Sequence, residues 1–385
     1  MKLIYICARD VSVLESQVLA LLSYLQSKGI DIYLLQGYKD SSEKENIERK
    51  LLSYPDLKVK YFVSFPSLPK NEKAQIRNIF GAISSVPNYQ NAILHIRGSH
   101  TCNLVKRELL KRNFSIPILY DCRGVELEEH RYRARKGSLY EKILHSFHVY
   151  YSKYSYKQLF ANDGYPMYIT SVSSLINEYI KQHYPECTYP MLVHPNIAGL
   201  QFVFSNDGRT EIRNQLGYSD NDLVAICSTN GNAIWQKDVL TIQHFVNNGI
   251  KVINLSSFDP NIQGCTTIKV KFQDMPKYLS AADIAVLWRD NTFMNNSASP
   301  SKFSEFAAMG LYVVHNGSVA IASDFIKNNN AGCIVEAVSN IINSINPDVV
   351  RAGRNERVKK GLETFGIESL GTSYIKLYGE ILKNN

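Results

Sequence analysis

Short apolar runs alternate along the chain with longer stretches in which apolar residues recur at helical spacing. The runs are rich in β-branched and aromatic residues, and they predict strands at 2–7, 30–36, 58–63, 91–96, 116–121 and 167–172, and again at 223–228, 250–255, 266–271, 283–288, 311–315 and 331–335. Strands that alternate with helices are typical of β-α-β units around a parallel sheet. The series restarts after 191–197, where a proline ends a strand and begins a connector. We therefore predict an α/β protein with two Rossmann-like, doubly wound domains.

The domain boundaries follow from this pattern. We place a first domain at 1–195, a second at 196–365 and a terminal helix at 366–385. Apolar side chains recur at helical spacing in the terminal helix, namely Leu370, Tyr374, Leu377, Tyr378 and Leu382. Because ligands of doubly wound sheets bind at the carboxyl ends of the strands, we expect the two domains to face a central cleft and to carry their chemistry on the loops after strands.

Composition and charge narrow the range of partners. The 385 residues are 45% hydrophobic, which excludes a disordered chain, and the net charge is +8. Residues 1–195 hold 26 basic and 18 acidic side chains, whereas residues 196–385 hold 17 of each. A basic first half predicts contact with something anionic, such as a membrane surface or an acidic substrate. Nucleic acid is disfavoured, because the basic residues form no recognisable reader motif.

Cysteine usage and the first residues indicate the compartment. The seven cysteines are odd in number and scattered, with no Cys-x-x-Cys pair, which argues for reduced thiols and against a disulfide framework or a zinc site. The chain enters a short strand at once, with no signal-like segment, and no apolar run approaches the roughly 20 residues that span a bilayer. We expect a cytoplasmic protein.

The strongest local signal is the stretch from Ser299 to Gly310, with the sequence Ser-Pro-Ser-Lys-Phe-Ser-Glu-Phe-Ala-Ala-Met-Gly. Ser299 is expected to cap a short helix, Pro300 to fit its first position and Gly310 to end it. The amino end of such a helix, with Lys302 in its first turn, suits a phosphate. Glu305 lies three residues on, on the same face, where a carboxylate can accept ribose hydroxyls. The pattern predicts a nucleotide site; an ordinary capped helix with a surface ion pair is the alternative.

Two further cations are expected beside this helix. Arg289 follows the predicted strand 283–288, and Lys237 ends a loop that begins with Asn230 and Gly231. Three cations suit a diphosphate without a metal, so we expect neither a metal nor another cofactor. Asp-Asn-Asp at 220–222 is formally a metal-binding pattern, but it precedes a strand and is interpreted as a polar turn. A dinucleotide cofactor is disfavoured, because no Gly-x-Gly-x-x-Gly follows the first strand of either domain.

These residues carry a family resemblance. Pro195-Asn196, Trp235-x-Lys237, the stretch 278–283 and the 299–310 motif together resemble family 4 of the glycosyltransferases. The resemblance implies a GT-B fold, with the acceptor in the first domain, a nucleotide sugar such as a UDP-sugar in the second, and a last helix that crosses back to the first domain.

The same resemblance implies roles for particular residues. Glu305 would hold the donor ribose, and Lys302 and Lys237 would hold the diphosphate. The remaining donor-binding candidates come from the same helix and the loops near it, namely Arg289, Ser301, Phe303, Asn230, Gly231, Arg9 and Ser12. The family often has a glutamate seven residues before Glu305, where this chain has Ser297, and an arginine in the 228–230 loop, whose charge Arg289 would replace.

Two loops of the first domain supply candidates for the acceptor side. One spans 95–100 and the other 121–129, and each contains a glycine that allows close approach of the backbone to a ligand. The second loop resembles an Asp-x-Arg-Gly segment of one branch of the family. Our catalytic or acceptor-contacting candidates are Arg123, Glu126, His100 and Asp121. The alternatives are a core role for His100 and a strand-end cap for Asp121.

The segment 137–160 mixes aromatic residues with Lys142, Lys153 and Lys157. Such a helix suits an anionic membrane surface, which predicts peripheral contact with the cytoplasmic face of a membrane. The alternative, a long core helix with a solvated basic face, is slightly favoured on the sequence alone.

Together these features predict a retaining, metal-independent glycosyltransferase. It would move a sugar from a nucleoside diphosphate to a hydroxyl of a glycan or lipid-linked saccharide, in the synthesis of a bacterial-type surface polysaccharide or glycoconjugate. Retention is implied by the family resemblance alone. The alternatives are a sugar-nucleotide 2-epimerase of similar fold and a non-catalytic protein that binds sugar nucleotides or polyanions.

Overall fold

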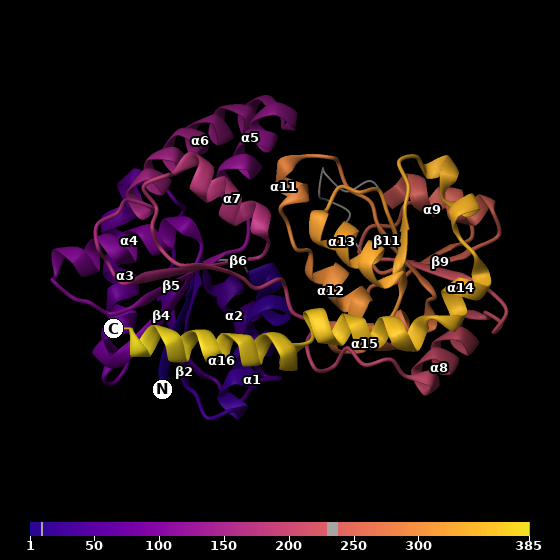
Figure 1. Cartoon of the computed structure of the whole chain (residues 1–385), viewed down its shortest axis with the longest axis horizontal. Helices are drawn as coiled ribbons and strands as arrows, with labels where there is room; N and C mark the ends of the chain where they lie inside the picture. Colours follow the sequence, from indigo (N-terminus) through magenta and orange to yellow (C-terminus); the bar gives the residue numbers. More distant parts are fainter. Residues whose placement is uncertain (9–10, 229–237, 385) are drawn as a thin grey trace. The chain divides into compact units, whose positions relative to one another are not determined.

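The apolar runs of the sequence form two separate parallel sheets in the computed structural model, which describes residues 1–8, 11–228 and 238–384. The chain divides into two units, each described by itself below. Unit 1 comprises Met1–Pro195 and Gly371–Asn385, and unit 2 comprises Asn196–Leu370. Figure 1 draws unit 1 in indigo to magenta, with the yellow end of the chain returning to it.

Unit 1 contains a seven-stranded parallel sheet of order β3-β2-β1-β4-β5-β6-β7. The strands are β1 (Lys2–Cys7), β2 (Asp31–Tyr38), β3 (Lys58–Val63), β4 (Ala92–Arg97), β5 (Ile118–Cys122), β6 (Met167–Ser171) and β7 (Met191–Val193). All strands predicted for this half are confirmed. The order reverses between β1 and β4, and ligands of open α/β sheets bind at such a switch point.

Helices connect these strands and cover the sheet (Figure 1). They are α1 (Ala20–Ser27), α2 (Ser41–Leu51), α3 (Glu72–Ser84), α4 (Ser99–Lys111), α5 (Glu126–Lys136), α6 (Leu139–Leu159) and α7 (Ser174–His183). Side chains alternate between the two faces of each strand. Ile4 and Ile6 pack in the same core as Ile79 and Val105, from α3 and α4, whereas Tyr5 lies beside His95. Among the described residues, no helix has the length and apolar content needed to cross a bilayer.

The last helix, α16 (Ile367–Lys383), contributes its larger part to unit 1. Tyr374 stacks on His194 with ring centroids 4.2 Å apart, and the Tyr378 hydroxyl hydrogen-bonds His95 Nδ1 at 2.7 Å. Both tyrosines are fully buried, as the helical spacing predicts. The prediction for Leu382 is wrong: it is 41% exposed, and its neighbour Ile381 is buried instead. The helix turns about 100° per residue, so by its last turn the buried stripe has shifted by one position.

Unit 2 contains a six-stranded parallel sheet of order β10-β9-β8-β11-β12-β13. The strands are β8 (Val224–Cys227), β9 (Lys251–Asn254), β10 (Cys265–Thr267), β11 (Ile284–Leu287), β12 (Tyr312–His315) and β13 (Gly332–Ile334). Six strands were predicted here, and the prediction for 266–271 is too long. Since β9 ends at Asn254, which pairs with Thr267, the residues after Thr267 have no neighbouring strand to extend along.

The helices of unit 2 alternate with these strands (Figure 1). They are α8 (Asn206–Leu216), α9 (Asp238–Asn247), α10 (Met275–Ala281), α11 (Phe293–Asn296), α12 (Ser301–Ala308), α13 (Ala320–Asn329), α14 (Pro347–Ala352) and α15 (Arg354–Phe365). Both units thus have the Rossmann-like, doubly wound architecture that the alternation of apolar runs predicts.

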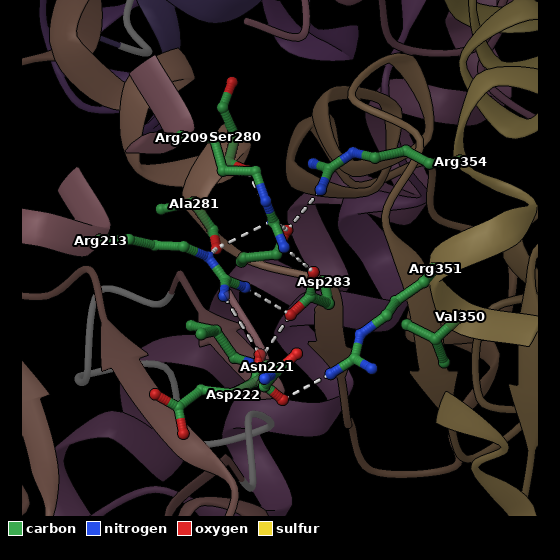
Figure 2. A network of polar contacts seen from close by, with 12 residues as sticks. Arg209, Arg213, Asn221, Asp222, Ser280, Ala281, Asp283, Val350, Arg351 and Arg354 are labelled. Atoms are coloured by element: carbon green, nitrogen blue, oxygen red, sulfur yellow. Dashed lines mark hydrogen bonds and ion pairs between the residues drawn. The ribbon is translucent and has the colours of Figure 1, made fainter. Parts of the chain in front are cut away.

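A buried polar network ties helices to the amino-terminal edge of the unit 2 sheet (Figure 2). Asp283, directly before β11, accepts from Arg209 Nη2 at 2.6 Å, from Arg213 Nη2 at 2.7 Å and from the Val224 amide at 3.0 Å. Arg354 donates to the carbonyls of Leu279, in the last turn of α10, and of Ala282, directly after that helix. This edge is opposite to the one where ligands bind, so the network holds the fold together.

Candidate functional site

The amino end of α12 carries no side-chain cap. The helix begins at Ser301, with Pro300 in the capping position. The expectation that Ser299 caps it is wrong, because the Ser299 hydroxyl accepts from the Asn196 amide at 3.0 Å and its carbonyl accepts from the Asn196 side chain. Ser299 thus fastens the connector between the units to this helix. The Phe303 amide donates to the Pro300 carbonyl at 2.9 Å, so the first-turn amides left to a ligand or to solvent are those of Ser301 and Lys302. Such an end, with its partial positive charge, suits an anion.

Lys302 and Glu305 share one face of α12, as their spacing predicts. Lys302 Nζ lies 3.5 Å from Glu305 Oε2 and is 31% exposed, whereas Glu305 is 1% exposed. Burial raises the pKa of Glu305, and the Lys302 charge opposes this shift. Among the described residues, Glu305 Oε2 has no hydrogen-bond partner. The ion pair named in the alternative is present, but its carboxylate is buried rather than at the surface. A buried carboxylate oxygen without a donor is costly, and ligand hydroxyl groups would satisfy it.

The carboxyl end of α12 is fixed by two arginines of α15, of which Arg354 is half-buried and Arg357 is buried. Arg354 Nε donates to the Met309 carbonyl at 3.2 Å, and Arg357 Nε donates to the Gly310 carbonyl at 2.9 Å. Gly310 has φ +66°, so it ends the helix in the left-handed conformation that its position in the sequence predicts. The two cations complement the negative end of the helix dipole at the carboxyl end of α12. The positive end of the dipole, at the amino end of α12, remains for an anionic ligand.

Other donor-site candidates fall into different places. Phe303 requires a correction: its ring is fully buried and packs edge-on against Phe325 and Phe365, so it is a core residue. Ser301 is half-buried in the first turn of α12. Ser297, at the position of the family's first glutamate, is buried and donates to the Phe293 carbonyl at 2.9 Å.

Arg289 lies two residues after β11, at the carboxyl edge of the sheet, as predicted from the sequence. Asn316 holds its backbone from the loop after β12: the Arg289 amide donates to Asn316 Oδ1 at 3.4 Å, and Asn316 Nδ2 donates to the Arg289 carbonyl at 2.6 Å. The candidates Lys237, Asn230, Gly231 and Arg9 lie outside the described residues.

Unit 1 has a polar cavity of about 800 Å³ at the carboxyl edge of its own sheet. The sequence candidates Ser12, His100 and Glu126 line it together. Further lining residues come from the end of β4, from the loops after β1, β3 and β4, and from helices α4, α5 and α6, namely Ala8, Ser64, Phe65, Arg97, Gly98, Thr101, Glu129, His130, Arg133 and His145. The cavity is of the size of ordinary small-ligand sites.

Glu126 is engaged within the wall of this cavity. Its carboxylate accepts from the Ser99 amide at 3.0 Å and from the Ser99 hydroxyl at 2.6 Å. It thereby caps the first turn of α4 from a distant part of the sequence, where a negative charge is favoured. Its contact with an acceptor stays a prediction, and the structure adds a positioning role for the 98–100 turn.

Asp121 and Arg123 form a buried cluster behind the cavity rather than part of its lining. Arg123 Nε lies 2.7 Å from Asp121 Oδ1, and the Tyr5 hydroxyl donates to Asp121 Oδ2 at 2.9 Å. Arg97 Nη1 lies 3.8 Å from the same oxygen. Burial alone would raise the pKa of Asp121, but the Arg123 and Arg97 charges outweigh it and lower the pKa. Asp121 is thus a buried anion that holds the Arg123 and Arg97 side chains in place, which is more than the strand-end cap considered for it.

Arg97 was missed as a site residue. It is the last residue of β4, it lines the cavity, and it donates to Gln17 Oε1 at 2.5 Å. The rule that selected Asp121, a polar residue at the end of a buried strand, would have selected Arg97 as well.

His100 lines the cavity as a neutral imidazole. Its ring lies 5.4 Å from that of Tyr151, and burial lowers its pKa to about 4, so the ring is neutral at pH 7. His100 Nδ1 is buried and has no hydrogen-bond partner among the described residues. A ring with so low a pKa is a weak base at pH 7, so the catalytic role of His100 stays a prediction beside the core role considered for it.

A second group of histidines contributes His130 and His145 to the cavity lining, and the sequence analysis missed it. His130 Nδ1 lies 3.0 Å from His145 Nδ1, and His130 stacks on His148. Burial and the two neighbouring histidines lower the pKa of His130 to about 4. His130 lies on α5, whereas His145 and His148 lie 15 and 18 residues later on α6. The sequence gives no local sign that these two helices bring the three rings together.

Comparisons with known proteins identify the architecture. No protein-family model matches the chain, and no curated protein matches it. Solved structures do. Thermosynechococcus elongatus sucrose-phosphate synthase is similar over 100% of both chains, with a TM-score of 0.72 and 11% identity. Anabaena HepE, in complex with UDP and glucose, is similar over 99% of this chain and 100% of its own, with a TM-score of 0.68 and 11% identity.

The Neisseria meningitidis UDP-GlcNAc 2-epimerase, bound to UDP-GlcNAc, is also similar over 100% of both chains, with a TM-score of 0.56 and 14% identity. The fold is therefore GT-B, with two Rossmann-like domains and a last helix that returns to the first, as the sequence resemblance implies. At these identities the similarity establishes the fold alone.

Proposed function

We propose that the chain is a glycosyltransferase that binds a nucleotide sugar at the amino end of α12 and transfers the sugar to a hydroxyl group held in the unit 1 cavity. One observation carries this proposal: Glu305 is buried, lacks a hydrogen-bond donor for Oε2 among the described residues, and lies 3.5 Å from Lys302 at an uncapped helix end. This arrangement combines an acceptor for ribose hydroxyls with a cationic site for phosphate. The UDP complex of HepE supports a uridine nucleotide.

The chemistry would be mainly electrostatic. Lys302, the α12 amides and Arg289 would stabilise the charge of the departing diphosphate, and Lys237 would add to them. The cavity would align the acceptor hydroxyl, which favours reaction by holding the two reactants together. We propose retention at the anomeric carbon, with the departing phosphate able to take the acceptor proton, and no metal, because the cations supply the charge that a metal otherwise provides.

The acceptor class follows from the cavity lining. Arg97, Arg133, Ser12 and Ser64 can bind hydroxyl or acidic groups, and Phe65 adds an apolar surface. We propose a glycan or a lipid-linked saccharide as the acceptor, in surface polysaccharide or glycoconjugate synthesis. We place the reaction in a reducing cytoplasm, because the scattered cysteines form no Cys-x-x-Cys pair.

The test uses Lys302→Gln and Glu305→Gln. Both variants should bind UDP about tenfold more weakly, because Lys302→Gln removes the cation that faces the phosphates and Glu305→Gln removes the carboxylate that accepts the ribose hydroxyls. Both should also lose transfer from a panel of UDP-sugars. Lys360 and Glu363 form a matched control: they are also three residues apart on a helix, with Nζ and Oε2 at 3.2 Å, but both are exposed. Lys360→Gln and Glu363→Gln should leave UDP binding unchanged. Undiminished transfer in both α12 variants would contradict the proposal.

A 2-epimerase is the second candidate, favoured by the similarity to the Neisseria enzyme. Incubation with UDP-GlcNAc alone separates the two, because an epimerase needs no acceptor and changes the sugar while it stays on the nucleotide. If the protein binds UDP but neither transfers, hydrolyses nor epimerises any donor, it is a sugar-nucleotide-binding protein.

A further inference from the structure

The outer face of α6 exposes an unusually apolar stripe. Six large apolar side chains there are between 46% and 77% exposed, namely Leu139, Tyr140, Ile143, Phe147, Tyr150 and Tyr154. They recur at helical spacing over four turns, so they form one continuous surface. Soluble proteins rarely leave so large a contiguous apolar patch in water unless it binds something.

Lysines border this stripe on one side. At 100° per residue, the apolar residues cover about a quarter of the helix circumference, and Lys142, Lys153 and Lys157 occupy the adjoining arc. All three lysines are exposed, as are Arg135 and Lys136 just before the helix. The one acidic residue of α6, Glu141, is used in the capping box with Ser138. The exposed rim of the stripe is therefore basic.

We propose that α6 docks the protein on an anionic phospholipid surface, with its apolar stripe inserted at the level of the headgroups. Tyrosine and phenylalanine favour this interfacial depth, and long lysine side chains reach back to anionic headgroups. A second copy of the chain is a poorer occupant, because pairing two stripes would bring the lysine rims of both copies together. This inference does not depend on the transferase proposal, since it rests on α6 alone.

The structure also changes the expectation drawn from the sequence. A core helix with a solvated basic face was slightly favoured, but the buried residues of α6 lie in its second half, namely Tyr151, Ser152, Ser155, Tyr156 and Leu159. The first half, 139–150, projects an apolar face that no described residue covers. Positive charge of the first domain thus lies beside an apolar surface. Both contributions to membrane affinity are therefore present, namely burial of apolar area and attraction to anionic lipids.

The experiment is flotation of the full chain with vesicles of phosphatidylcholine, with and without about 30% phosphatidylserine. The wild type should float with the anionic vesicles. About 0.5 M salt should release part of it, because salt at that concentration screens the attraction between the lysines and the anionic headgroups. Ile143→Ser with Tyr150→Ser should lose binding at low salt. Lys142→Gln, Lys153→Gln and Lys157→Gln together should weaken binding to anionic vesicles roughly a hundredfold, at about a factor of five for each charge.

Two exposed apolar residues elsewhere serve as the matched control. Leu52 is 79% exposed in unit 1 and Leu200 is 59% exposed in unit 2, and their replacement by serine should leave flotation unchanged. All these variants should keep the wild-type circular dichroism spectrum and urea-unfolding midpoint, which shows that they fold. The proposal is overturned if the wild type ignores anionic vesicles at low salt, or if the Ile143→Ser, Tyr150→Ser variant binds as well as the wild type. Stripe-dependent dimers without vesicle binding, or capture of an acidic protein in place of lipid, would overturn it as well.

Discussion

Each unit buries one aspartate between arginines, and the two clusters lie at opposite edges of their sheets. Asp283 precedes β11 at the amino edge of unit 2, and Asp121 lies near the end of β5 at the carboxyl edge of unit 1. The Asp283 carboxylate accepts hydrogen bonds from Arg209, Arg213 and a backbone amide at donor–acceptor distances of 2.6 to 3.0 Å. The Asp121 carboxylate accepts a hydrogen bond from Tyr5 at 2.9 Å and forms an ion pair with Arg123 at 2.7 Å. The same pairing of charges thus appears at the carboxyl edge, where ligands of such sheets usually bind, and at the opposite, amino edge.

The surroundings of the two clusters differ in a way that explains this. Arg213 also donates to the carbonyls of Ala281 and Ser219, so its hydrogen-bonding capacity is used within the fold. The Asp121 cluster includes the titratable ring of His95 and reaches the cavity through Arg97. A buried ion pair is weak proof of function on its own. The position along the strand and the presence of a neighbouring cavity distinguish a structural cluster from a candidate site.

The largest expected effect is that of Asp283→Ala on stability. Removal of the carboxylate leaves two arginines without their anion in the interior, which should lower the free energy of unfolding of unit 2 by about 3–5 kcal/mol. Both tryptophans of the chain, at 235 and 288, belong to unit 2, so tryptophan fluorescence during urea unfolding reports on this unit.

Asp220→Ala is the matched control, because Asp220 is an exposed aspartate of the same unit. It should change the unfolding free energy by less than about 0.5 kcal/mol. Equal stability of Asp283→Ala and Asp220→Ala would contradict the structural role given to the Asp283 network.

The second prediction concerns pH and the unit 1 cluster. Burial, with Arg123, His194 and Arg97 adding to it and Asp121 opposing, lowers the pKa of His95 to about 3. Between pH 6.5 and about 3 the unfolded chain therefore binds a proton that the folded chain does not, so stability falls as the pH decreases through this window. The loss is on the order of a few kcal/mol, since one pKa unit corresponds to about 1.4 kcal/mol.

His95→Gln tests this by comparison of urea unfolding, followed by circular dichroism, at pH 7 and pH 5. Glutamine stays neutral, so the variant should lose less stability on acidification than the wild type does. His183, an exposed histidine of the same unit, provides the control His183→Gln, which should keep the wild-type pH dependence. A His95→Gln variant as acid-sensitive as the wild type would refute the assignment.

The sequence predicted the fold well because the central strands of both sheets, such as β1, β4, β8, β11 and β12, are almost wholly buried, and such strands are visible as continuous apolar runs. The errors lie where tertiary neighbours decide. The strand at 266–271 stops early because β9 ends at Asn254, and Leu382 is exposed because Ile381 takes the buried position. Neither effect is encoded in the local pattern.

For the candidate site, the sequence predicted some residues correctly and others wrongly, and the distance of their partners along the chain again decides which. Lys302, Glu305 and Gly310 could be placed because their roles depend on spacing within one helix. Ser299 could not, since its partner Asn196 is 103 residues away in the sequence. The Asp283 network was missed because its arginines lie far from Asp283 in the sequence, Arg209 and Arg213 on α8 and Arg354 on α15, and a single sequence gives no sign of such pairings.

The smallest effect is expected at Gly310, and it tests how tightly the arginines of α15 hold the end of α12. Gly310 and Gly217 end helices of unit 2 with similar φ, +66° and +69°. A Cβ on Gly217 would meet nothing within 4 Å, whereas a Cβ on Gly310 would lie 2.6 Å from both the Arg354 carbonyl oxygen and Val358 Cγ2. Alanine at either site pays the strain of a left-handed conformation, about 1 kcal/mol, so the difference between the two variants isolates the contact with α15.

We expect Gly310→Ala to destabilise unit 2 by about 1–3 kcal/mol more than Gly217→Ala does, which is the usual range for overpacking. Tryptophan fluorescence during urea unfolding measures both variants. If the contact also positions α12, Gly310→Ala should weaken UDP binding while Gly217→Ala leaves it unchanged, because only the first displaces the arginines from the Met309 and Gly310 carbonyls. Equal destabilisation by the two substitutions would mean that α15 yields easily, and that the end of α12 is set by its glycine rather than by the arginines behind it.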